Sequence, residues 1–86
     1  MEVTAQIQEI NAPQVITDKF TKREFIAVVE HTSNYPQPRL FTLVNKNCSV
    51  IDNFNVGDVV TLSFNMNGRA AGGKVYNSDV VWKITK

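Results

Sequence analysis

Residues 55–85, NVGDVVTLSFNMNGRAAGGKVYNSDVVWKIT, decide the fold class because they predict two long strands joined as a hairpin. The first strand opens after a sharp turn at residues 55–58. From there Val60, Leu62, Phe64 and Met66 alternate with Thr61, Ser63 and Asn65, as in a strand with one buried face. Residues 67–73 carry three glycines and predict a loop. Residues 74–85 then predict the closing strand of the chain.

The amino-terminal half also shows strand periodicity. Apolar residues at 3, 5 and 7 alternate with polar ones, the pattern breaks at residues 11–13, and it resumes at Val15 and Ile16. A polar turn at residues 17–22 leads to a second strand, REFIAVVEH. Residues 32–38 predict a hairpin loop because their two prolines lack the donor that a strand ladder needs.

The third strand follows in PRLFTLVN, residues 38–45. Residues 45–54, NKNCSVIDNF, are less extended in character and have room for one short helical turn. Three strands, a connector and a two-stranded hairpin suit the OB-fold, a five-stranded all-β Greek-key barrel. The alternatives are an SH3-like barrel and an open meander. With 86 residues the chain is expected to form a single domain, residues 1–86.

Composition narrows the class of protein. The net charge is only +1, so any preference for a polyanion has to come from the distribution of charge. The single cysteine, Cys48, cannot form an internal disulfide, which fits a reducing compartment. No apolar run is long enough to span a bilayer, and the first ten residues lack the features of a signal peptide. We therefore expect a soluble cytoplasmic protein.

Two stretches support a resemblance to known families. The run NVGDVVTLSFNMNGR, followed after a gap by KVYNSDVVWKI, is similar to the closing hairpin of bacterial single-stranded-DNA-binding proteins. The wider pattern of residues 20–84 more closely resembles a family of short bacterial and phage OB-fold proteins of unknown function, proposed to bind single-stranded DNA. The tip RAAGGK departs from the expected aromatic or polar residues, and residues 1–86 include no stretch like the acidic, proline-rich tail of the larger bacterial proteins. The resemblance implies an OB barrel in a bacterial or phage-infected cell.

Basic residues gather in two segments. Six of the nine lysines and arginines flank the first hairpin turn or belong to the last hairpin: Lys19, Lys22, Arg23, Arg69, Lys74 and Lys83. In an OB-fold these hairpins flank the binding face built on the second and third strands, so distant charges would line one groove. The competing interpretation is an ordinary solvated surface.

Flat rings are the second requirement for holding single strands, because bases stack on them. Tyr76 is the preferred platform, and Phe20 and Phe41 are further candidates. For Phe20 a role as a loop anchor fits equally well. For Trp82 a barrel-closing core position is favoured over a platform, and the sequence does not fix which face of their strands Phe41, Tyr76 and Trp82 occupy. Phe25, Phe54 and Phe64 stand among apolar neighbours and are expected in the core.

Catalysis and metal binding have little support. His31 and Cys48 stand in different segments without an orienting third group, and two such ligands do not make a zinc site. GRAAGGK lacks the spacing, hydroxyl residue and following helix of a phosphate loop.

We therefore expect no enzyme, no cofactor, no membrane contact and no small-molecule substrate. The expected partner is single-stranded DNA, held with little sequence preference by a homo-oligomer during replication, recombination or repair. The alternative is an OB-fold protein-interaction module.

Overall fold

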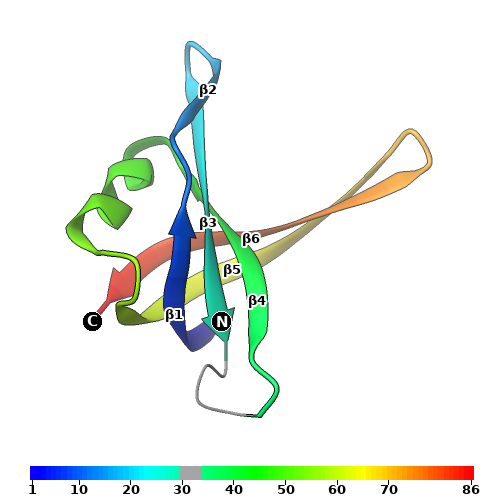
Figure 1. Cartoon of the computed structure of the whole chain (residues 1–86). Helices are drawn as coiled ribbons and strands as arrows, with labels where there is room; N and C mark the ends of the chain where they lie inside the picture. Colours follow the sequence, from blue (N-terminus) through cyan, green and yellow to red (C-terminus); the bar gives the residue numbers. More distant parts are fainter. Residues whose placement is uncertain (30–33) are drawn as a thin grey trace.

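The computed structural model describes residues 1–29 and 34–86, apart from the side chains of Arg69, Ala71 and Tyr76. The described elements are β1 (Glu2–Ile10), β2 (Gln14–Thr17), β3 (Phe20–Val29), β4 (Gln37–Val44), the 3₁₀ helix η1 (Asn45–Asn53), β5 (Val59–Ala71) and β6 (Lys74–Thr85) (Figure 1). The break predicted at residues 11–13 separates β1 from β2, which together correspond to the predicted first strand.

The strands form one sheet of order β1-β5-β6-β4-β3-β2, and a further pairing of β1 with β3 closes it into a ring. Neighbouring strands are antiparallel except β4 and β6, which run parallel where Thr42 faces Val80. This confirms the all-β barrel of the OB type.

Both hairpins that leave the barrel are longer than predicted. The turn expected at residues 17–22 shrinks to Asp18 and Lys19, because β3 already begins at Phe20. The loop expected at residues 67–73 shrinks to Gly72 and Gly73, whose φ angles of 58° and 78° suit a two-residue turn that matches strand twist. The glycines therefore keep the strands paired to the tip of a long ribbon.

The loop between β3 and β4 also differs from the prediction. β4 begins at Gln37, so Pro38 is the second residue of the strand and lies opposite Val28. A proline is tolerated there because it stands near the start of the strand. The predicted loop residues 32 and 33 lie outside the described residues, as does His31.

The connector carries the predicted helical segment at the predicted place. η1 spans nine residues, more than one short turn. Cys48 and Ile51 are buried in the core, while the helix covers one end of the barrel (Figure 1). The backbone N–H of Phe54 donates to the carbonyl of Ile51 at 3.0 Å and ends the helix.

Apolar residues of the barrel strands point inward, mostly in alternation, and the bulge in β6 sets the buried Val81 and Ile84 three residues apart. Phe25 stacks on Phe41 with ring centroids 5.6 Å apart, and Phe41 meets Phe64 edge to face at 5.4 Å. Phe41 is 0 % exposed, so its suggested role as a base platform is wrong: its ring fills the barrel. Phe25 and Phe64 are buried as predicted, and Phe54 packs against the core.

Candidate nucleic-acid interface

The two projecting hairpins leave the barrel on either side of β4 (Figure 1). The β2–β3 hairpin turns at Asp18 and Lys19, and the β5–β6 ribbon turns at Gly72 and Gly73. β4 is paired with β3 along its length and touches β6 at Thr42. The outer surface of β3 and β4 is therefore the sheet face between the hairpins.

This outer face, defined by Ile26, Val28, Pro38 and Leu40, is aliphatic. The register places Ile26 opposite Leu40 and Val28 opposite Pro38, and on β3 the buried Phe25 and Ala27 flank Ile26. Leu40 is 51 % exposed, a large fraction for a leucine in a sheet. Val80 of β6 continues the face, since it lies opposite Thr42. The face offers apolar contact area, but no aromatic ring belongs to it.

Four of the predicted cations are accessible. Lys19 is exposed at the tip of its hairpin, Lys74 is exposed beside the tip of the ribbon, and Lys83 is exposed on β6. Lys22 is partly exposed, with its ammonium 3.9 Å from the carboxylate of Glu24. At that distance and exposure the pair is weak, so both ions stay available to solvent. The four lysines thus come from both hairpins, as the sequence predicted.

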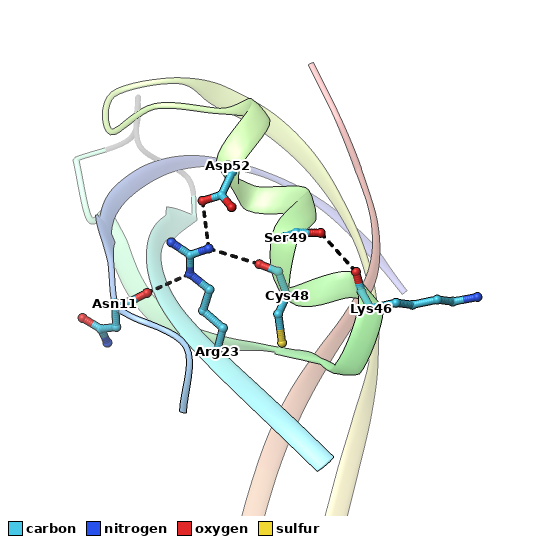
Figure 2. A network of polar contacts seen from close by, with 6 residues as sticks. All are labelled: Asn11, Arg23, Lys46, Cys48, Ser49 and Asp52. Atoms are coloured by element: carbon cyan, nitrogen blue, oxygen red, sulfur yellow. Dashed lines mark hydrogen bonds and ion pairs between the residues drawn. The ribbon is translucent and has the colours of Figure 1, made fainter. Parts of the chain in front are cut away.

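Arg23 has a different role from the one predicted. Its Nε donates to the carbonyl of Asn11 at 2.8 Å, and its Nη1 donates to the carbonyl of Cys48 at 3.2 Å and to Asp52 at 2.8 Å (Figure 2). Only 14 % of the side chain is exposed. The prediction of a phosphate contact is wrong because these donors are used to join β3 to η1 and to Asn11, the residue after β1.

An open hollow of about 270 Å³ lies beside this cluster, lined by Pro13, Thr21, Arg23, Asn45, Lys46, Cys48, Ser49 and Asp52. The Lys46 side chain extends away from the arginine, while its carbonyl accepts the Ser49 hydroxyl at 3.3 Å (Figure 2). Sequence reasoning missed the exposed Lys46, because nothing in the sequence sets it apart from the other lysines.

Three aromatic residues are exposed in the described chain. Phe20 is 37 % exposed at the start of β3, and Tyr35 lies in the loop before β4. Trp82 is 55 % exposed, so its interpretation as core is wrong. The register of β5 and β6 shifts between Ser63 and Phe64, which leaves Trp82 as an extra residue between Val81 and Lys83. Simple alternation cannot anticipate such a bulge.

The root of the ribbon is held to β4 by an ion pair that the sequence did not reveal. Nη2 of Arg39 lies 2.6 Å from Oδ2 of Asp79, and the Asp79 side chain is only 13 % exposed. Residues 39 and 79 are far apart in sequence, and no local pattern pairs them. Arg69 faces Tyr76 in the backbone ladder further out. Both side chains, named as binding residues from sequence, lie outside the described part.

Cys48 is buried and its Sγ donates to the carbonyls of Leu43 and Thr21 at 3.4 Å and 3.5 Å. Burial raises the pKa of this thiol, and the nearby Arg23 charge opposes that rise in part. Among residues 1–29 and 34–86, no group of three or more His, Cys, Asp or Glu could hold a metal ion. Within the same residues, no helix has the length and apolar character needed to cross a membrane.

Comparison with known proteins places the chain in a family. The family described as domain of unknown function (DUF3127) matches residues 2–85, and the chain belongs to it. No curated protein matches the chain.

Proposed function

We propose that this protein binds single-stranded DNA, with little sequence preference, across the outer face of β3 and β4. The observation that carries the proposal is that exposed or partly exposed lysines lie on two hairpins, on either side of an aliphatic face that is partly open to solvent. Single strands need cations along the backbone path and apolar or aromatic surface for the bases. The arrangement supplies both requirements without a strongly basic net charge.

In this mechanism Lys19 and Lys22 of one hairpin, with Lys74 and Lys83 of the other, attract phosphates. Arg69 is proposed to add to the second group. Bases would contact Leu40 and its aliphatic neighbours, and would stack on aromatic rings of the two hairpins. Tyr76 and Phe20 remain the proposed platforms, and Trp82 joins them because it is exposed.

Weak sequence preference follows from these contacts, since every base offers a ring face and none of the proposed groups reads a base edge. A protein of this kind would cover exposed strands during replication, recombination or repair in the cytoplasm of a bacterial or phage-infected cell. It would bind rather than catalyse.

The experiment is a titration of labelled oligo-dT and of a matching duplex at two salt concentrations. Release of counterions from about three to five phosphates gives a log–log salt slope of roughly −2 to −3.5 for the single strand. The single strand should bind much more tightly than the duplex. A flat salt response, or equal affinity for both, would remove the proposal.

A second candidate is a protein-interaction module on the same face. The observation in its favour is that Ile26, Val28, Pro38 and Leu40 are all aliphatic, as in the centre of many protein interfaces. A failed DNA titration would favour this candidate.

A further inference from the structure

The β5–β6 ribbon leaves the barrel with one edge of β5 unpaired. β1 covers that edge only from Val59 to Ser63, where its last ladder partner is Glu2. Met1 adds one more pair, because its amino group donates to the carbonyl of Phe64 at 2.9 Å and its carbonyl accepts the Phe64 N–H at 2.8 Å. Beyond Phe64, no described strand pairs with β5 on that side. The ribbon extends well clear of the barrel (Figure 1).

The two hydrogen bonds between Met1 and Phe64 show which residues of β5 direct their backbone groups toward the open edge. Both polar groups of Phe64 point toward β1, and in an antiparallel strand every second residue points to the same side. Met66, Gly68 and Ala70 therefore present their N–H and C=O groups to the open edge. The pairing at the tip gives the same direction. Ala71 pairs with Lys74 across a two-residue turn, so the polar groups of Ala71 point toward β6 and those of Ala70 point toward the open edge.

Exposed edges in natural proteins are usually protected by charge, by proline or by short length. β2, at the end of the sheet, has four residues and follows Pro13. β6 carries Lys74 and Asp79 along its part of the ribbon. Residues 65–71 of β5, NMNGRAA, contain a single charge and no proline. Of the open edges described here, this one is the least protected against pairing.

We propose that two copies of this chain pair antiparallel through residues 65–71 of β5, about a two-fold axis at Gly68. In this register Gly68 lies opposite Gly68 of the second copy, and Met66 lies opposite Ala70. The groups of Met66, Gly68 and Ala70 then exchange N–H···O=C bonds, and two ribbons become a four-stranded sheet. Two-stranded ribbons are marginally stable alone in water, so both copies gain order.

The register is the one that the residues favour. A shift by one residue would place opposite faces of the two ribbons together. A shift by two toward the tip would put Arg69 opposite Arg69, while a shift by two toward the barrel would reach Phe64, which Met1 already occupies. In the proposed register Arg69 faces Asn67, so no like charges meet. Such an edge-to-edge contact is isologous and closes as a dimer.

The test is sedimentation equilibrium of the purified protein without DNA, so its outcome is independent of the proposed function. The apparent mass of the wild type should rise with protein concentration from 9.7 kDa toward twice that value. Gly68→Lys should stay at 9.7 kDa because two ammonium groups would face each other at the axis. A Cβ at Gly68 meets only Asn77 Oδ1, at 3.6 Å, so the substitution fits within one copy.

Gly68→Ala, which adds the Cβ without a charge, should associate like the wild type. An equimolar mixture of Gly68→Lys and Gly68→Asp should recover the dimer that each variant lacks alone. Ala70→Lys offers a second disruption, checked for folding by circular dichroism. A wild type that stays monomeric up to the millimolar range, or an association that Gly68→Lys and Ala70→Lys both leave unchanged, would overturn the proposal.

Discussion

Arg23 and Asp52 are 29 residues apart in the sequence, yet Nη1 of Arg23 lies 2.8 Å from Oδ1 of Asp52. The same guanidinium donates to the carbonyls of Asn11 and Cys48 (Figure 2). One side chain on β3 thus holds both the end of β1 and the helix η1. An arginine that sequence alone suggests for DNA contact instead organises one end of the barrel.

Replacing Arg23 should therefore affect stability rather than binding. Arg23→Ala leaves the exposed carbonyl of Asn11 and the partly buried carbonyl of Cys48 without their donor, and hydrogen bonds to charged groups contribute about 1.5–3 kcal/mol each. Because the bonds to Asn11 and Asp52 are exposed and contribute little, we expect the free energy of unfolding, measured in urea, to fall by about 1.5–3 kcal/mol in total. The folded variant should keep the wild-type salt slope for oligo-dT.

Asp52→Asn is the matched control. The Asp52 side chain is 63 % exposed, and exposed ion pairs contribute about 1 kcal/mol or less. This variant should be less destabilised than Arg23→Ala. A normal urea midpoint for Arg23→Ala, together with a salt slope weakened by about 0.7, would instead place Arg23 on a phosphate.

Leu40 and Phe41 are adjacent but face opposite sides of β4. Leu40→Ala should change the free energy of unfolding little, and should weaken oligo-dT binding by about 1–2 kcal/mol if bases cover the side chain. Phe41→Ala removes a ring from the centre of the barrel and should cost about 3–5 kcal/mol of stability. Urea titration and fluorescence anisotropy on both variants measure the two effects. Unchanged affinity in Leu40→Ala would indicate that DNA does not cross this face.

Trp82 is the only tryptophan, so its fluorescence reports one site. With 55 % of its surface exposed, its emission should be close to that of tryptophan in water, and oligo-dT should quench it if bases stack on the ring. Trp82→Ala should then weaken binding by roughly 1–3 kcal/mol with little change in salt slope. Quenching by free nucleotide alone serves as the control. Tight binding without any quenching would exclude Trp82 from the interface.

The fold was readable from sequence because most of its strands show an alternating pattern and its breaks fall at proline, glycine and polar turns. Val60, Leu62 and Phe64 are buried as their period of two predicts. Met66, expected on the same face, is 61 % exposed, because it lies on the ribbon beyond the barrel. The lengths of the hairpins could not be predicted from the sequence. The strands stay paired until only two residues are left for the turn, and the polar and glycine residues before the turn gave no sign of this pairing. Both Gly72 and Gly73 adopt positive φ angles, which shortens the turn and lengthens the ribbon.

The site was only partly readable, for reasons that concern single residues. Lys19 and Lys74 are exposed on hairpins, as local sequence indicates. The roles of Arg23 and Arg39 depend on carboxylates distant in sequence, Asp52 and Asp79, and no periodicity reveals such pairs. Trp82 was misassigned because a bulge in β6 breaks the alternation that the assignment assumed.

Asp58 gives the fold a dependence on acidic pH. The backbone N–H of Asn55 donates to its carboxylate at 2.9 Å and lowers its pKa; partial burial opposes this, and Lys86 at 3.3 Å lowers the pKa further. A folded pKa below the unfolded value of about 3.9 stabilises the protein above that pH, and the stabilisation is lost as pH falls through the folded pKa. The urea midpoints of wild type and Asp58→Asn should therefore differ most at neutral pH and converge below about pH 4. A constant difference across that range would contradict the linkage.

The lysines provide the most direct test of the proposed DNA path. Each cation that meets a phosphate adds about 0.7 to the magnitude of the single-strand salt slope. Lys19→Ala and Lys74→Ala, one on each hairpin, should each reduce the slope by about that amount, and the double variant should lose about twice as much. Lys86→Ala is the matched control, because the Lys86 ammonium lies 3.3 Å from the Asp58 carboxylate, away from both hairpin tips. All three changes remove one positive charge, so a general effect of net charge would lower every slope alike. If only the hairpin variants respond, the strand runs between the two hairpins; if only Lys74→Ala responds, it follows the β5–β6 ribbon instead.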